Sequence, residues 1–176
     1  FQPDVVIVKG SDGNKEAVLR TSSMAGDVSK ELVGGTALVP NYVQSLTANG
    51  FTVGDSDRVN SAGVTYQWIA FKASGGFLAV GSYAGNGVAG RTVTGLGFAP
   101  EALFVADENN SEPVFRTAAA PEAYNFSNNA GHTDWSALCS SLPSERLWDL
   151  CQVIGHTYHQ GRDHERQRLY RLFAEG

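Results

Sequence analysis

The stretch that decides the fold is GFAPEALFV at residues 97–105, because it repeats the start of the chain, FQPDVVIV at residues 1–8. Both copies continue to a second match, in which VLRT at residues 18–21 corresponds to VFRT at residues 114–117. The interval between the two matches is one residue shorter in the later copy. An internal repeat of this kind indicates two copies of one structural unit.

The bulk composition agrees with two small globular units. The chain has 176 residues, which allows two units of roughly 80–100 residues, near the size at which a domain folds alone. A hydrophobic content of 42% is typical of a globular protein and not of a disordered one. The 20 glycines cluster between short apolar runs, which favours strands joined by turns.

Charge and hydropathy exclude several classes of partner. The net charge is −5 and the first 140 residues have no basic stripe, which argues against a nucleic-acid surface there. No apolar run reaches the ~18 residues of a membrane span, and no signal peptide is visible. The two cysteines, Cys139 and Cys151, form no disulfide framework, and we expect no cofactor. Because the chain starts inside a repeat, we expect it to be a fragment of a longer protein.

The first copy predicts a series of short strands. Alternating or β-branched apolar runs bounded by turn residues indicate strands, and here they cover residues 4–9, 17–21, 42–46, 51–54 and 65–73. Asp12-Gly13 predicts a hairpin turn between the first two strands. Residues 22–33 are ambiguous, and Asp27 is placed to cap a short helical turn there.

The second copy predicts a leading hairpin that the first copy lacks. Residues 77–83 and 91–94 are strand-like and flank a Gly-rich turn at residues 85–87. The best linker is Ser74-Gly75-Gly76. We therefore predict a mainly β fold of tandem antiparallel β-sandwich units, with a first β unit at 1–74 that lacks its leading hairpin and a second at 77–144.

The C-terminal tail, residues 145–176, does not match the repeat. Leu147, Leu150, Cys151 and Ile154 recur at helical spacing, so the tail is predicted to be helical and to match the sandwich poorly. Codons for Glu145-Arg146-Leu147, with one base dropped, can encode the Asn-Gly-Phe that the repeat requires at that place. This observation suggests a frame-shifted tail as an alternative to a genuine one, and the coding DNA distinguishes the two.

Two groups of residues are weak metal candidates. Asp55, Asp57 and Asn60 offer oxygen ligands at near-alternate positions of one loop, but the EF-hand glycine and glutamate are missing, which favours an ordinary turn. His156, His159 and His164, with Glu165, have some of the spacing of zinc ligands but lie in the atypical tail. We predict no metal site at either place.

Repeated charges and aromatic side chains complete the candidates. Asp4 and Glu101 are equivalent by repeat, as are Arg20 and Arg116, and a cross-strand ion pair that fixes the sheet is the favoured interpretation. Four aromatic residues are candidates for a sugar-stacking surface, although aromatic residues of strands more often lie in the core; they are Tyr66, Trp68, Tyr83 and Trp135. The glycines at residues 85–90 lie between two strands, so they predict a hairpin and not a phosphate-binding loop.

Several motifs occur together in one order that resembles a known group. They are VGSYAGNG at residues 80–87, GFAPE at 97–101, NGFTVG at 49–54 and YQWIAF at 66–71. The combination resembles β-sandwich repeats of unknown function in phage tail-fibre-like and large secreted bacterial proteins. The resemblance covers about residues 1–142, and the tail departs from it. It carries no agreed catalytic residues, and it implies a surface or virion role with glycan or host-surface contact.

From the residues and the resemblance together we expect a non-catalytic structural or adhesion repeat module of an extracellular or virion tail-fibre-like protein. The expected partners are a cell-surface glycan or neighbouring repeat units, including further copies in a homo-oligomer, and neither nucleic acid nor a membrane. The alternative is a carbohydrate-binding module of a secreted enzyme, which an exposed aromatic row beside a groove would favour. An enzyme would instead require a pocket of convergent polar groups.

Overall fold

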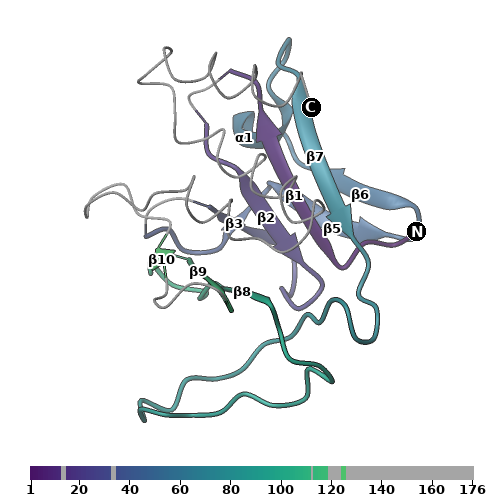
Figure 1. The fold of residues 1–176 in the computed structure, drawn as a ribbon. Coiled ribbons are helices and arrows are strands. Elements are labelled where there is room, and N and C mark those ends of the chain that lie inside the picture. The colour runs from purple at the N-terminus through teal and green to yellow at the C-terminus, as the bar shows by residue number, and fades with distance from the viewer. Residues whose placement is uncertain (13–14, 33–34, 112, 119–123, 126–176) are drawn as a thin grey trace, which may run out of the picture.

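The computed structural model of the protein describes residues 1–12, 15–32, 35–111, 113–118 and 124–125, and in them the chain is mainly β (Figure 1). The elements in chain order are β1 (Val5–Gly10), β2 (Val18–Thr21), β3 (Val28–Glu31), β4 (Val39–Pro40), β5 (Val43–Thr47), β6 (Gly50–Val53), α1 (Asp57–Asn60), β7 (Tyr66–Phe71), β8 (Ala102–Val105), β9 (Val114–Thr117) and β10 (Tyr124–Asn125). Within this part of the chain, no helix is long and apolar enough to cross a bilayer.

The centre of the fold is an antiparallel five-stranded sheet with the order β4-β3-β2-β1-β7. The strand β1 lies between β2 and β7, and its β-branched residues favour the extended backbone. Ile7 pairs with Leu19 on one side and with Ile69 on the other. Because successive side chains of a strand point to opposite faces, this register divides the apolar residues between two faces of the sheet.

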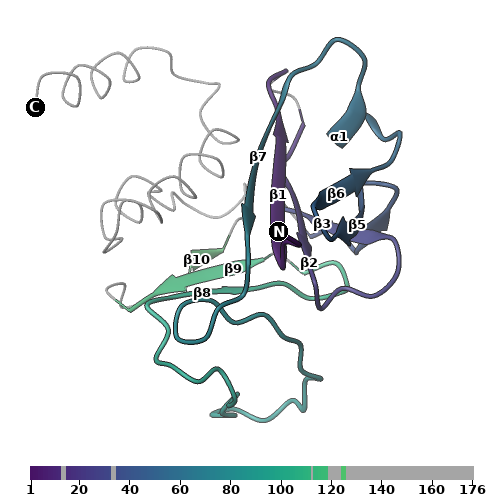
Figure 2. The same ribbon diagram turned by 90° about the vertical axis from the view of Figure 1, so that its right-hand side faces the viewer.

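One face of the sheet is covered by the hairpin of β5 and β6 together with α1 (Figure 2). Val6, Val8 and Val18 of the sheet form a buried cluster with Val43 of β5 and Val59 of α1. Val6, Val18 and Val43 are all 0% exposed. This layer is contributed entirely by residues before the predicted boundary at residues 74–76.

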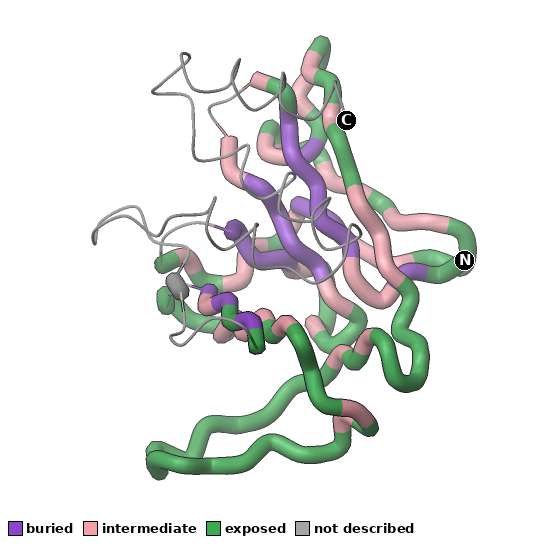
Figure 3. The backbone as a smooth tube through the Cα atoms, in the orientation of Figure 1, coloured by how far each residue is buried: buried purple, intermediate pink, exposed green. Residues whose placement is uncertain are grey.

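The opposite face is covered by the hairpin of β8 and β9, which belongs to the second copy of the repeat. Ile7, Leu19 and Leu32 form a buried cluster with Phe115 of β9, and Phe104 of β8 packs against it. The buried residues in Figure 3 accordingly follow the central strands, and both faces of the five-stranded sheet are covered.

The two copies of the repeat form the same hairpin. In the first copy Val5 pairs with Thr21, and in the second Ala102 pairs with Thr117, so residues equivalent in sequence are paired identically. The backbone N–H of Ser22 donates to Asp4 at 2.8 Å, and that of Ala118 donates to Glu101 at 2.8 Å. The repeat therefore specifies local strand pairing in both places, although the two hairpins have different neighbours.

Two local predictions from the sequence were wrong, and the stretch left ambiguous at residues 22–33 contains a strand. Residues 28–31 form β3, and α1 occupies part of the loop predicted at residues 55–63. Residues 77–100, called the arm below, contain neither of the two predicted strands. The arm is exposed except for half-buried Leu78, Val80, Leu96 and Phe98. Two strands without a third strand or an apolar surface to cover are marginal in water.

In the described residues, the fold confirms a mainly β architecture of antiparallel sheets with almost no helix. Of the second predicted unit, 77–144, the structure describes residues 77–111, 113–118 and 124–125. The predicted helical tail at 145–176, its frame-shift hypothesis, and His156, His159, His164 and Glu165 lie outside the described residues.

Phe115 and Leu103 provide a matched test of the packing between the two copies. Phe115 is 5% exposed against the sheet, whereas Leu103, on the neighbouring strand, is 43% exposed. We expect Phe115→Ala to lower the free energy of unfolding by about 3–5 kcal/mol, because it leaves a cavity in a packed core. Leu103→Ala should cost about 1 kcal/mol or less. Urea unfolding measures both, and equal losses would contradict the described packing.

Candidate functional site

The most unusual charged group in the structure is Lys30, whose side chain is 0% exposed. Its ammonium group donates to the carbonyl oxygen of Thr36, which follows β3 in the chain. It also reaches the turn between β8 and β9, at Asp107 O (3.1 Å), Asp107 Oδ1 (3.3 Å), Asn109 O (2.9 Å) and Ser111 O (3.1 Å). Three N–H donors therefore face five oxygen atoms, and we call this arrangement the Lys30 clamp.

The clamp depends on a close approach between two loops. Gly35 lies against the carbonyl oxygen of Asn110, so closely that a Cβ atom at position 35 would collide with it. The backbone N–H of Leu38 donates to Glu108 O at 3.2 Å, which joins the same two loops again. A glycine permits this contact because it has no side chain.

The clamp also affects the carboxyl group of Asp107. Lone-pair oxygens surround the nitrogen, and a hydrogen bond from Ser111, followed by the contact with Lys30, lowers the pKa of the Asp107 carboxyl from its ordinary value. The clamp therefore joins the two copies of the repeat through hydrogen bonds and one ion pair.

Removing the clamp should be costly. In Lys30→Met the surrounding oxygens lose their donor in a closed space, so we expect a loss of about 3 kcal/mol in the free energy of unfolding. The matched control is Lys72→Met, because Lys72 is 54% exposed in its ion pair with Asp4, and such pairs contribute about 1 kcal/mol or less. Chemical denaturation measures both, and a Lys30→Met protein as stable as the wild type would contradict the clamp.

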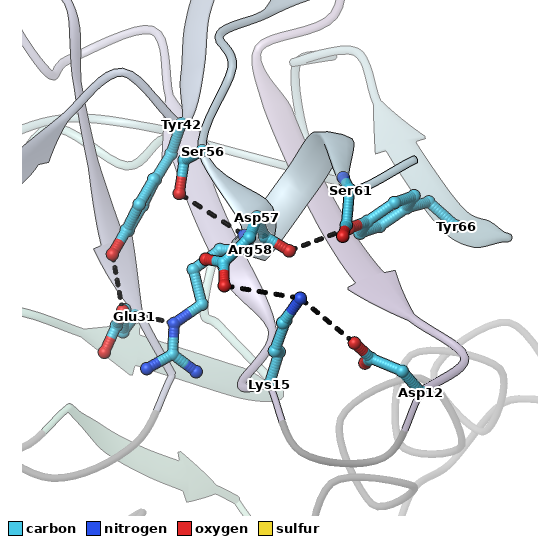
Figure 4. A network of polar contacts seen from close by, with 9 residues as sticks. All are labelled: Asp12, Lys15, Glu31, Tyr42, Ser56, Asp57, Arg58, Ser61 and Tyr66. Atoms are coloured by element: carbon cyan, nitrogen blue, oxygen red, sulfur yellow. Dashed lines mark hydrogen bonds and ion pairs between the residues drawn. The ribbon is translucent and has the colours of Figure 1, made fainter. Parts of the chain in front are cut away.

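A second polar network surrounds Glu31, the neighbour of Lys30 in β3 (Figure 4). The Tyr42 hydroxyl donates to Glu31 Oε1 at 2.7 Å, and Arg58 Nε lies 3.2 Å from the same oxygen. Nearby, Lys15 forms ion pairs with Asp12 (3.2 Å) and Asp57 (3.4 Å). The network fixes α1 and the loop after β1 to the sheet, and each carboxylate in it has a cationic partner.

Tyr42 gives this network a measurable pH dependence. Burial, together with the hydrogen bond to Glu31, raises the pKa of Tyr42 from 10.0 to about 12. Because the folded-state pKa lies above the unfolded one, the contribution of the hydroxyl to stability is complete below pH 10 and is lost as the pH rises toward 12.

We expect Tyr42→Phe to cost about 1.5 kcal/mol at pH 7, because it removes a buried hydrogen bond to a charged acceptor. The difference from the wild type should shrink as the pH is raised above 10. Urea unfolding at a series of pH values measures it, with Tyr83→Phe as an exposed control. A difference that stays constant with pH would show that Tyr42 does not hold its proton in this way.

The three residues considered as calcium ligands each have a separate partner. Asp55 accepts a hydrogen bond from the side chain of Asn41, Asp57 pairs with Lys15, and Asn60 donates to Gly54 O at 2.9 Å. Among the described residues, no group of three or more His, Cys, Asp or Glu side chains is placed to hold a metal ion. The arrangement gives no support for a metal in this loop.

The repeated charges do not form the predicted cross-strand ion pair in the first copy. Asp4 pairs with Lys72 at 3.0 Å and accepts from Ala73 N at 2.7 Å. Arg20 is 6% exposed and donates to the carbonyl oxygens of Val28, Met24 and Gly26. Its equivalent in the second copy, Arg116, is exposed. Arg20 therefore holds the loop between β2 and β3. The repeat keeps an arginine at both positions, but the two arginines have different surroundings.

The three aromatic candidates among the described residues lie in two segments, with Tyr66 and Trp68 on β7 and Tyr83 in the arm. Tyr66 is half-buried, and its hydroxyl accepts from Ser61 N (2.9 Å) and donates to Asp57 O (2.8 Å), which is a structural role. Trp68 is 61% exposed and meets Phe51 edge to face, with ring centroids 5.8 Å apart. Tyr83 is 51% exposed and lies in the arm, and Trp135 is outside the described residues.

The arm contains an open hollow that the sequence did not predict. It has a volume of about 460 Å³, and the side chains that line it include Tyr83, Asn86, Val88, Arg91 and Val93. The guanidinium of Arg91 lies 5.2 Å from the centroid of the Tyr83 ring and donates to Ala84 O. Gly85, Gly87 and Gly90, which have no side chains, also line it.

Comparison with known proteins identifies the family of the chain. A family model described as a domain of unknown function, DUF7483, matches residues 1–137. The chain belongs to this family. The matched region of DUF7483 includes all the described strands and both loops of the Lys30 clamp. No curated protein matches the chain, and no solved structure does.

Proposed function

We propose that this DUF7483 chain is a non-catalytic structural or adhesion module of an extracellular or virion tail-fibre-like protein, built from tandem antiparallel β-sandwich units. The observation that carries the proposal is the Lys30 clamp, in which a lysine side chain that is 0% exposed joins one copy of the repeat to the other. Modules that transmit load or hold a spacing need such contacts between repeats, since stability then depends on neighbour interfaces.

The other buried polar groups support the same proposal. Arg20 binds backbone carbonyl oxygens, and Glu31 is shared by Tyr42 and Arg58. Catalytic sites instead direct side chains with shifted pKa values into a cleft, where a substrate can reach them. The partners of these side chains are local elements of the fold, which is what a structural module requires.

Sugar binding is the second candidate, as a carbohydrate-binding module of a secreted enzyme. The observation that favours it is Trp68, whose exposed ring stands on β7 beside Phe51. Exposed aromatic faces stack on the apolar faces of sugar rings, and Tyr83 offers a second such ring in the arm. Because Trp68 and Tyr83 lie in different segments, β7 and the arm, we rank sugar binding below the structural function.

Two measurements test the proposals. An antibody raised against the chain should detect the parent protein in purified virions or in the extracellular fraction of the cells that encode it, and detection only in the soluble cell interior would contradict the first proposal.

A glycan array tests the second proposal. If a glycan binds, we expect Trp68→Ala to weaken binding by about tenfold, the cost of one stacked ring. Phe77→Ala, which removes a ring that is also 63% exposed, is the control and should leave binding unchanged.

A further inference from the structure

The arm leaves the end of β7 and returns to β8 without joining a sheet (Figures 1 and 2). Among the described residues, no backbone hydrogen bond joins residues 79–100 to any other part of the chain. The strand β7 is likewise the end strand of the five-stranded sheet in this part of the structure. An exposed edge strand with the sequence Tyr66-Gln67-Trp68-Ile69-Ala70-Phe71 is a site where another strand can add.

One bridge of an antiparallel pairing between the arm and the residues that follow β7 is already formed. Ser74 and Leu78 make an isolated antiparallel bridge, in which Ser74 N donates to Leu78 O at 3.2 Å and Leu78 N donates to Ser74 O at 3.1 Å. The two residues exchange both bonds, so they form a closely spaced, hydrogen-bonded pair of an antiparallel ladder. Gly76, with a φ of 79°, turns the chain between them.

The register set by the Ser74–Leu78 bridge agrees with the direction in which the backbone N–H and C=O groups of β7 point. Phe71 O accepts from Asp4 N, and Thr65 O accepts from Ser11 N, so odd-numbered residues direct their backbone groups toward β1. Because backbone groups alternate along a strand, Trp68, Ala70 and Lys72 direct theirs to the open side. Extending the ladder from Ser74 and Leu78 in steps of two pairs these three residues with Ala84, Ser82 and Val80.

We propose that residues 78–84 of the arm dock on the open edge of β7, in the register of the Ser74–Leu78 bridge, as a sixth strand of the central sheet. The side chains then fall on suitable faces. Tyr83 lies opposite Ile69, which packs on the side of the second hairpin, and Ser82 lies opposite Ala70, which packs on the side of β5 and β6. Docking satisfies the open edge of β7 with a segment of the same chain.

The connection to β8 permits this movement. Residues 85–101 remain to join the docked strand to the start of β8, and 17 residues span up to about 56 Å when fully extended. Gly95 and Gly97, with φ values of 94° and 81°, supply backbone freedom at the end of the arm. The second hairpin can therefore stay in the Lys30 clamp while the arm closes.

Cross-linking in the full chain tests the proposal. In a protein with Cys139→Ser and Cys151→Ser, the pair Ala70→Cys and Ser82→Cys introduces thiols opposite each other in the proposed register, at a separation suited to a disulfide. The matched control is Ala70→Cys with Gly81→Cys, which is shifted by one residue and directs the two thiols to opposite faces. We expect the first pair to oxidise to an intramolecular disulfide about tenfold faster than the second.

Hydrogen exchange provides an independent measurement without substitutions. The backbone amides of Val80, Ser82 and Ala84 should exchange more slowly than those of Gly81 and Tyr83, since only the first group donates to β7 in the proposed register. Equal cross-linking of the two cysteine pairs together with uniformly fast exchange would overturn the proposal. A disulfide-linked dimer from the first pair would also overturn it, because the edge would then be receiving the strand of a second copy.

Discussion

The buried ammonium of Lys30 is the constraint on which the described structure depends. Removing a charge from water costs several kcal/mol, and among the described residues the first copy of the repeat supplies Lys30 with one acceptor, the carbonyl oxygen of Thr36 between β3 and β4. The remaining oxygens come from the turn between β8 and β9, 77 to 81 residues away in the chain. The sheet of the first copy is therefore complete only when the hairpin of the second copy lies against it, and Phe115 of that hairpin forms a buried cluster with Ile7 and Leu19 of the sheet.

This dependence explains how a repeated sequence gives two different environments. Both copies form a hairpin in the same register, because strand pairing is specified by local residues. In the first copy the hairpin is central, with β7 on one side and Arg20 binding the loop after β2. In the second copy the hairpin is a covering layer, and Arg116 is exposed. The two copies are therefore equivalent in strand pairing within the hairpin, but not in what surrounds the hairpin.

The same arrangement bears on the function of the family. The charges of the interior are used to hold elements together, as in the sharing of Glu31 by Tyr42 and Arg58. Trp68 on β7 is exposed instead, and the hollow of the arm beside Tyr83 and Arg91 is open. Under the proposed adhesion function, recognition would depend on surface side chains whose arrangement is set by β7 and the arm.

The sequence by itself determined the mainly β class, the repeat and most strands of the first copy, because alternation and turn residues act over a few positions. β1, β2 and β7 were predicted for this reason, whereas β3, with its polar residues Ser29, Lys30 and Glu31, gave no apolar pattern. Only the tertiary structure decided that Lys30 is buried, that Tyr66 is structural, and that the predicted hairpin at residues 77–94 stands apart as an arm. The physical reason is that each of these outcomes depends on partners distant in the chain, and no local pattern records which carbonyl oxygens or strand edges will be near.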